Sequence, residues 1–151
     1  MPAHIPYNFT GVIDISFGSV WYALSVALRY DILRKPLGLH FTAEQLIIED
    51  REFHIAYIEE GKVLGCLILV PKENGVIKMR QVAVAENIQG KGIGKKMVLF
   101  AENFSKEKTF TVMDLNARKT AVPFYLSLGY TIKGDEFEEV TIPHLRMLKE
   151  L

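Results

Sequence analysis

The sequence predicts an α/β protein in which antiparallel and parallel strands share one mixed sheet. A hairpin pattern in the first half of the chain is followed by alternating strand, helix, strand, helix and strand patterns. The 151 residues contain no internal repeat, low-complexity segment or Pro/Ser-rich linker, so we expect a single domain over residues 1–151. Hydrophobic residues make up 49% and charged residues 24%, which is typical of globular proteins.

The N-terminal third of the chain is predicted to hold one strand and two helices. Residues 12–15 are short and β-favouring. Apolar residues at a spacing of four predict an amphipathic helix from Ser19 to about Arg34, since Pro36 follows and stops it. A second, shorter helix begins at Thr42, where Thr-Ala-Glu-Gln resembles a capping box.

The rest of the chain alternates strand and helix patterns. Two β-rich runs on either side of a Glu-Gly turn predict a hairpin of residues 53–58 and 63–70, and a third strand follows over residues 76–84. A helical pattern then covers residues 92–104, and Gly129 ends a later short helix as a C-cap glycine does. The remaining predicted elements are a strand at 110–115, that short helix at 120–128, and strands at 130–133 and 145–148.

Charge and cysteine content exclude several classes of protein. The 18 Lys and Arg balance 18 Asp and Glu, which argues against a histone-like nucleic-acid binder or an acidic tail. The lone Cys66 excludes a disulfide-stapled scaffold, and the four histidines lack metal-ligand spacing. The N-terminal six residues carry no signal-peptide pattern, and the apolar stretch 19–28 is shorter than the about 20 residues that span a bilayer. We therefore expect a cytoplasmic protein with no metal, no membrane partner and no nucleic-acid partner.

The most informative segment is the loop that precedes the helix predicted at residues 92–104. Three glycines alternate at positions 90, 92 and 94, with lysines at positions 91, 95 and 96. Glycine lets backbone amides approach a ligand, and a helix N-terminus carries partial positive charge, so this loop predicts an anion site. P-loop spacing is absent. A dinucleotide-binding loop fits less well, because the third glycine comes one residue early and five residues separate the strand from the first glycine.

At positions 89–94 the chain reads Gln-Gly-Lys-Gly-Ile-Gly, which resembles the Gln/Arg-x-x-Gly-x-Gly/Ala loop of the GNAT superfamily of Gcn5-related N-acetyltransferases. The strand segment 81–84 and the downstream segments 115–117 and 121–130 resemble the family's neighbouring elements in the same order. Segments 34–38 and 137–147 further resemble the ElaA-like branch. The resemblance implies the GNAT acyl-CoA N-acyltransferase fold, a central, mostly antiparallel twisted sheet flanked by helices. It also implies direct transfer of acetyl from acetyl-CoA to an amine in a ternary complex.

The resemblance further implies which residues hold acetyl-CoA as co-substrate and CoA as product, without a metal. Asn116 would hydrogen-bond the cofactor near its sulfur. The strand backbone would pair with the pantetheine arm as another strand would, at Val82, Ala83 and Val84. The loop amides would bind the pyrophosphate, at Gln89, Gly90, Lys91, Gly92, Ile93 and Gly94.

The chemistry requires a base for the acceptor ammonium and an acid for the departing thiolate. Tyr125 occupies the family's usual acid position, and a phenol can donate a proton to a thiolate. The strand segment 78–81 lacks the carboxylate that serves as base in many relatives. The remaining candidates for the base lie in the C-terminal segment, where His144, Glu138 and Glu139 are found, and an imidazole is suited to proton transfer near neutral pH.

The acceptor is expected to be a small-molecule or peptide amine. Arg29 and Arg34, at the basic end of the first helix, either line the substrate cleft or lie in solvent, and a solvated helix end is the commoner case. Glu138 and Glu139 either attract a cationic amine or belong to a solvated acidic turn. Since dimers are common in the family, the resemblance allows a homodimer. The missing strand carboxylate leaves one alternative function open, a catalytically inert acyl-CoA-binding module.

Overall fold

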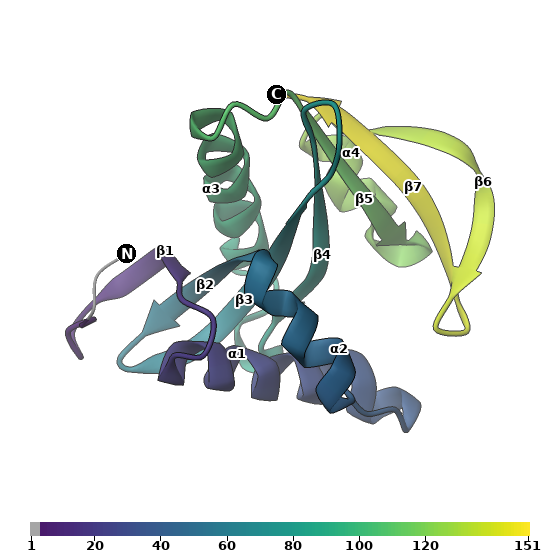
Figure 1. The fold of residues 1–151 in the computed structure, drawn as a ribbon. Helices are drawn as coiled ribbons and strands as arrows, with labels where there is room; N and C mark the ends of the chain where they lie inside the picture. Colours follow the sequence, from purple (N-terminus) through teal and green to yellow (C-terminus); the bar gives the residue numbers. More distant parts are fainter. Residues whose placement is uncertain (1–3) are drawn as a thin grey trace.

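The computed structural model describes residues 4–151, and residues 1–3, part of the segment in which we expected no signal peptide, lie outside it. A seven-stranded sheet runs through these residues in the order β1-β2-β3-β4-β5-β7-β6 (Figure 1). Strands β4 and β5 pair in parallel and the other neighbours pair antiparallel, which confirms the predicted mixed sheet. The strands are β1 (Thr10–Ile15), β2 (Phe53–Glu59), β3 (Lys62–Pro71), β4 (Val76–Val84), β5 (Val112–Arg118), β6 (Thr131–Glu139) and β7 (Ile142–Glu150).

Helices cover both faces of this sheet (Figure 1). The side chains of α3, among them the fully buried Met97 and Ala101, pack with those of α4 in one hydrophobic core. On the opposite face the α1 region packs over a second core that contains Cys66 and Ala83. The helices are α1 (Val20–Arg29), α2 (Ala43–Ile47), α3 (Ile93–Glu107) and α4 (Val122–Ser127), with short 3-10 turns at Lys35–Leu37, Ile48–Arg51, Glu86–Ile88 and Lys119–Ala121.

The predicted helix starts are confirmed by their caps. Ser19 caps α1 by accepting the backbone N–H of Tyr22 at 3.1 Å. Thr42 and Gln45 form both halves of the predicted capping box of α2. The end of the first helix differs from a regular α-helix, because α1 continues as a π-helical turn over Tyr30–Arg34. That wider turn lies next to the site described below, as π-helical turns often do.

Strand β4 contains a bulge that reverses its inside-outside alternation. Cys66 of β3 pairs with Ala83, whereas Ile68 pairs with Arg80, so an extra residue is accommodated on β4. Gln81 has a φ of +52° there, a left-handed conformation that is costly for a residue with a side chain. Before the bulge Met79 points into the α3 core, and after it Ala83 points into the α1 core.

Strands β4 and β5 separate soon after they begin to pair. Their register covers only Val76 to Met79 against Val112 to Leu115 within residues 4–151. Beyond Met79 the edge of β4 that faces β5 therefore has no strand partner in the described chain. The two halves of the sheet diverge at this point (Figure 1).

The C-terminal strands are longer than predicted. The sequence predicts strands at 130–133 and 145–148 and leaves the acidic run after Gly134 open as a solvated turn, but β6 continues through that run to Glu139. Strand β5 likewise extends to Arg118 rather than ending at residue 115. The cause is tertiary pairing with β7, since a polar segment becomes a strand when a neighbour satisfies its backbone hydrogen bonds.

Candidate active site

A cavity of about 400 Å³ opens where β4 and β5 separate. It is lined from both faces of the sheet, because side chains alternate along the two strands. We call one set of its lining residues the α4 side, which consists of Val82, Val84, Leu115, Ala117 and Tyr125. We call the other set the α1 side, which consists of Ile32, Leu33, Arg34, Lys78, Arg80, Arg118, Glu139 and His144.

The glycine loop fits an anionic ligand by its backbone shape. Gly90 and Gly92 both have a φ of +81°, and no atom lies within 4 Å of where a Cβ would stand, so the loop is an open cradle. Gly92 is the N-cap of the long helix α3, which has no side-chain cap and no acidic residue in its first turn. The first N–H groups of α3 are therefore available to a ligand. Exposed Lys91 adds positive charge in the loop itself.

The loop is held against the end of β4. The Gln89 side-chain amide donates to the carbonyl oxygen of Val84 at 2.9 Å. Gly94, in contrast, lies inside α3, and a Cβ there would be in ordinary contact with Phe124 at 3.5 Å. Only two of the three alternating glycines thus have a conformation that requires glycine. This arrangement fits a diphosphate at the loop and an extended pantetheine arm along the unpaired edge of β4.

Tyr125 lines the cavity from α4. The residue is 6% exposed, and burial raises the pKa of its phenol to about 12. Its hydroxyl has no hydrogen-bond partner in the part of the chain that the structure describes, although the ring packs edge-on against Phe124 and Tyr130. The phenol is therefore protonated at neutral pH and its proton is free to be donated to a ligand.

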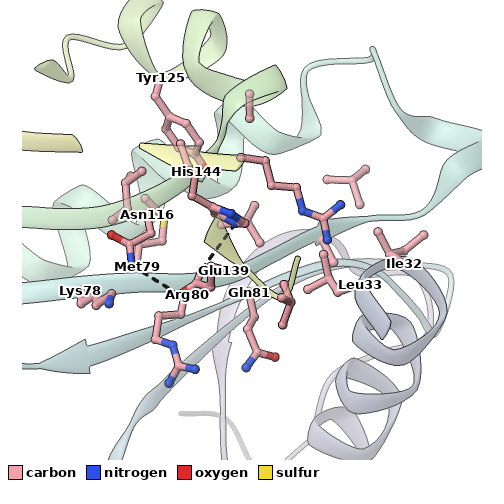
Figure 2. Close-up of a pocket in the computed structure, with 18 of the residues that line it drawn as sticks. Ile32, Leu33, Lys78, Met79, Arg80, Gln81, Asn116, Tyr125, Glu139 and His144 are labelled. Atoms are coloured by element: carbon pink, nitrogen blue, oxygen red, sulfur yellow. Dashed lines mark hydrogen bonds and ion pairs between the residues drawn. The ribbon is translucent and has the colours of Figure 1, made fainter. Parts of the chain in front are cut away.

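His144 and Glu139 meet on the α1 side of the cavity (Figure 2). The Nδ1 of His144 lies 2.7 Å from the carbonyl oxygen of Ile142, and since a carbonyl only accepts, Nδ1 carries the hydrogen. The neutral ring then has its lone pair on Nε2, which lies 3.4 Å from Glu139 Oε2. The other oxygen of Glu139 accepts from Asn116 Nδ2 at 3.5 Å. Nε2 thus faces the carboxylate of Glu139 across the α1 side of the cavity.

The structure brings most of the predicted site residues together. The cavity lining includes Arg34, Val82, Ala83, Val84, Gln89, Asn116, Tyr125, Glu139 and His144. Gly90, Lys91, Gly92, Ile93 and Gly94 lie outside that lining, in the loop and the start of α3. Glu138 is also outside it, exposed on β6, because alternation places it on the opposite face from Glu139.

Two features of the site were not predicted. Arg29, expected to lie at a solvated helix end, is 1% exposed and forms a buried ion pair with Glu49 at 2.8 Å. The same guanidinium donates to Gln81 Oε1 at the β4 bulge, also at 2.8 Å. Arg80 and Arg118, the second feature, line the α1 side. The only sequence signal for these two is their place at polar positions of strands that flank the glycine loop.

Two other titratable groups, Cys66 and His54, are buried outside the cavity lining. Cys66 is buried, and burial raises the pKa of its thiol to about 12, so it packs as an apolar side chain. His54 is buried against the backbone carbonyl of Glu49 at 2.9 Å. Within residues 4–151 no group of three His, Cys, Asp or Glu side chains is placed to hold a metal ion. Over the same residues no helix is long and apolar enough to cross a membrane.

Comparison with known sequences finds relatives among acetyltransferases. Uncharacterized protein YyaT of Bacillus subtilis is 36% identical over 74 residues, which cover 49% of this chain and 50% of that protein. The chain thus spans about half the length of YyaT. Uncharacterized N-acetyltransferase YjcF of Bacillus subtilis is 29% identical over 124 residues, covering 82% of this chain and 88% of YjcF.

Solved structures share the fold. Escherichia coli ElaA superposes with a TM-score of 0.80 at 16% identity, covering 94% of this chain and 100% of ElaA. A Bacillus subtilis acetyltransferase solved in complex with CoA superposes with a TM-score of 0.69 at 16% identity, covering 95% and 99% of the two chains. The family model described as the acetyltransferase (GNAT) domain matches residues 39–151. With its diverging β4 and β5 and its open glycine cradle, the chain belongs to the GNAT acetyltransferase family.

Proposed function

We propose that this chain, as a single domain, is an acetyl-CoA-dependent N-acetyltransferase that moves acetyl directly to an amine in a ternary complex. The observation that carries the proposal is the cavity between β4 and β5, which connects an anion cradle to a proton-accepting pair. Acetyl-CoA, when bound, supplies the acetyl group as a thioester. CoA bound to a relative of the same fold supports this choice of co-substrate.

Binding would use backbone more than side chains. The amides at Gly90 to Gly94 and the start of α3 would hold the pyrophosphate, helped by the exposed Lys91. The unpaired edge of β4 at Val82, Ala83 and Val84 would pair with the pantetheine arm. An N–H on that edge would also polarise the thioester carbonyl. Asn116, on the facing strand, would donate near the sulfur.

Two side chains would move protons. His144 Nε2 would accept a proton from the acceptor ammonium, and the adjacent Glu139 would stabilise the resulting imidazolium. Tyr125 would donate its proton toward the departing thiolate. His144 on β7, together with Glu139 on β6, would thus supply the base that the β4 segment lacks.

The test measures thiol release from acetyl-CoA across a panel of primary amines. We expect turnover with at least one amine, and about 100-fold lower kcat for Tyr125→Phe and for His144→Gln. Tyr57→Phe is the matched control, because Tyr57 is equally buried at 6% exposure but lies outside the cavity. Tight CoA binding without turnover of any amine would overturn the enzyme and favour the inert binding module.

A further inference from the structure

Three arginines from separate elements converge on the α1 side of the cavity. Arg34 comes from the π-helical turn after α1, Arg80 from β4 immediately before the bulge, and Arg118 from the end of β5. Arg118 pairs in register with His144, so the two side chains lie on the same face of the sheet. We propose that the acceptor amine carries an acidic group, a carboxylate or a phosphate, and that these three arginines bind it. The inference rests on the proposed acetyltransferase function.

Within residues 4–151 none of the three arginines forms an ion pair with a carboxylate. Among residues 4–151 the ion pairs assign Glu49 to Arg29, Asp114 to Arg146 and Glu136 to Lys119. Glu139 is the carboxylate in the cavity lining, and it already contacts His144 and Asn116. Because Lys78 also lines the cavity, four cationic side chains face one engaged carboxylate. A bound anion is the partner that this charge distribution lacks.

The surroundings of Arg34 show the effect of this excess charge. Burial lowers the pKa of its guanidinium, and the nearby positive charges of Arg118, Arg80 and Arg29 lower it further. The Arg34 side chain is half-buried, and its guanidinium carbon lies 4.8 Å from the Phe41 ring centroid. Stacking of this kind holds the planar donor group in one orientation. An oriented arginine binds carboxylate or phosphate through two parallel hydrogen bonds.

The cofactor's own phosphates do not account for these arginines. The glycine cradle meets the cavity only through Gln89, and its lysines are exposed outside the lining. Arg80 and Arg118 alternate with Met79 and Ala117, which point into the α3 core, so the arginines face the α1 side. The glycine cradle, of which only Gln89 belongs to the lining, is therefore separate from the arginine cluster, whose three members all line the cavity.

A neighbouring carboxyl does not neutralise the cluster. Glu52 lines a smaller cavity of about 90 Å³ that Arg34 and Arg80 also line. Burial raises the pKa of Glu52 above its ordinary value, and its Oε1 has no hydrogen-bond partner in residues 4–151. It forms no ion pair with Arg34 or Arg80 within the described chain. The arginines are thus left for an external anion.

The acceptor class is tested with matched pairs of amines at saturating acetyl-CoA. One arm compares an α-amino acid with its carboxamide, and the other compares an aminosugar phosphate with the free aminosugar. We expect the acidic member of at least one pair to have a kcat/KM higher by about 10- to 100-fold. The arm that shows the preference identifies carboxylate or phosphate as the group. Equal rates within both pairs, or a preference for the neutral members, would overturn the inference.

Substitutions of the arginines test whether they cause the preference for the acidic amine. Arg34→Gln and Arg80→Gln should each reduce the preference to a few-fold, where the preference is the ratio of kcat/KM for the acidic and the neutral member of one pair, measured with the same variant. Arg51→Gln is the control, since Arg51 is an exposed arginine of the turn Ile48–Arg51 and lies outside both cavities. A preference that survives in both cavity variants would contradict the assignment.

A binding measurement separates this inference from the proposed function. Inorganic phosphate is titrated calorimetrically into CoA-saturated protein, so that the cofactor's phosphate site is already filled. Saturable binding that Arg34→Gln abolishes supports the anion site even if no amine is acetylated, in which case only the enzyme proposal fails. Turnover of neutral amines without phosphate binding leaves the enzyme standing and overturns the anion site.

Discussion

Two buried glutamates, Glu49 in the turn Ile48–Arg51 and Glu102 on α3, have nearly the same chemistry and different surroundings. Glu49 accepts the Tyr22 hydroxyl at 2.7 Å and is paired with Arg29 at 2.8 Å. Glu102, on α3, accepts the Tyr130 hydroxyl at 2.8 Å and is paired with Lys149 at 3.0 Å. Each cluster thus joins a carboxylate, a tyrosine and a cation. We call them the Glu49 cluster and the Glu102 cluster.

The clusters differ in the second hydrogen bond that each cation, Arg29 or Lys149, donates in addition to its ion pair. Arg29 also donates to Gln81 Oε1, so the Glu49 cluster is tied to the left-handed residue that forms the β4 bulge. Lys149 instead donates to the carbonyl oxygen of Leu128, away from the cavity lining. Lys149 is 25% exposed as a side chain, whereas Arg29 is 1% exposed. Both clusters therefore join elements of the fold, and the Glu49 cluster is in addition hydrogen-bonded to β4, the strand that lines the candidate site.

Removing the charge of Glu49 should have the largest effect. Glu49→Gln leaves the Arg29 guanidinium buried without a carboxylate, which we expect to cost about 3–5 kcal/mol of unfolding free energy. Chemical denaturation measures this loss. The double variant Arg29→Met with Glu49→Leu should recover much of the stability, because it removes both charges, but not kcat/KM, because Gln81 has lost its donor. Full recovery of both would show that the cluster only supports the fold.

Glu102→Gln is the matched substitution in the other cluster and should cost less. The Lys149 ammonium is partly exposed and can be hydrated, so we expect a loss of about 2 kcal/mol by chemical denaturation. Because the Glu102 cluster does not line the cavity, kcat/KM of the folded variant should equal that of the parent. A drop in kcat/KM comparable with that of the Glu49 variants would remove the distinction between the clusters.

Two substitutions at Gln81 isolate the link between the Glu49 cluster and the strand. Gln81→Ala and Gln81→Gly both delete the acceptor for Arg29, but glycine adopts a φ of +52° without strain. We expect the glycine variant to be more stable than the alanine variant by about 1 kcal/mol in denaturation experiments. Both should lose activity. Wild-type activity in the alanine variant would show that the bulge does not depend on Arg29.

The bounds of β4 could be predicted from the sequence, whereas its bulge and its contact with the Glu49 cluster could not. Strand β4 has the bounds predicted from its apolar pattern, residues 76–84, because hydrophobic alternation is a local property. Its bulge was missed, since no local pattern signals the left-handed conformation of Gln81 or its hydrogen bond from Arg29, which lies 52 residues earlier in the chain. Arg29 itself was expected in solvent, because a basic residue at a helix end is usually exposed and its buried partner Glu49 is not signalled by spacing.

The site shows the same division. The glycine loop and Tyr125 were identifiable because the residues of each motif are adjacent in the chain. The pairing of His144 with Glu139 is only partly predictable, because an acidic run is also typical of a solvated turn, whereas here it forms β6 opposite β7. The arginine cluster was not predicted. Its members are separated by tens of residues and are brought together only by the order of the strands.

The smallest expected effect is the pH dependence that the Glu49 cluster adds to the stability. Burial alone would raise the pKa of Glu49, but hydrogen bonds from Arg29 and Tyr22 outweigh it and hold the pKa below its ordinary value. A carboxyl whose pKa is lower in the folded state stabilises the protein above its unfolded pKa, and this stabilisation is lost as the pH falls through the folded value. Unfolding free energies measured from pH 7 down to about pH 3 should therefore fall more steeply below about pH 4.5 in the parent than in the Arg29→Met, Glu49→Leu double variant. Parallel curves would mean that the buried guanidinium of Arg29 does not favour the charged form of Glu49, and the ion pair would then contribute to stability without depending on pH in this range.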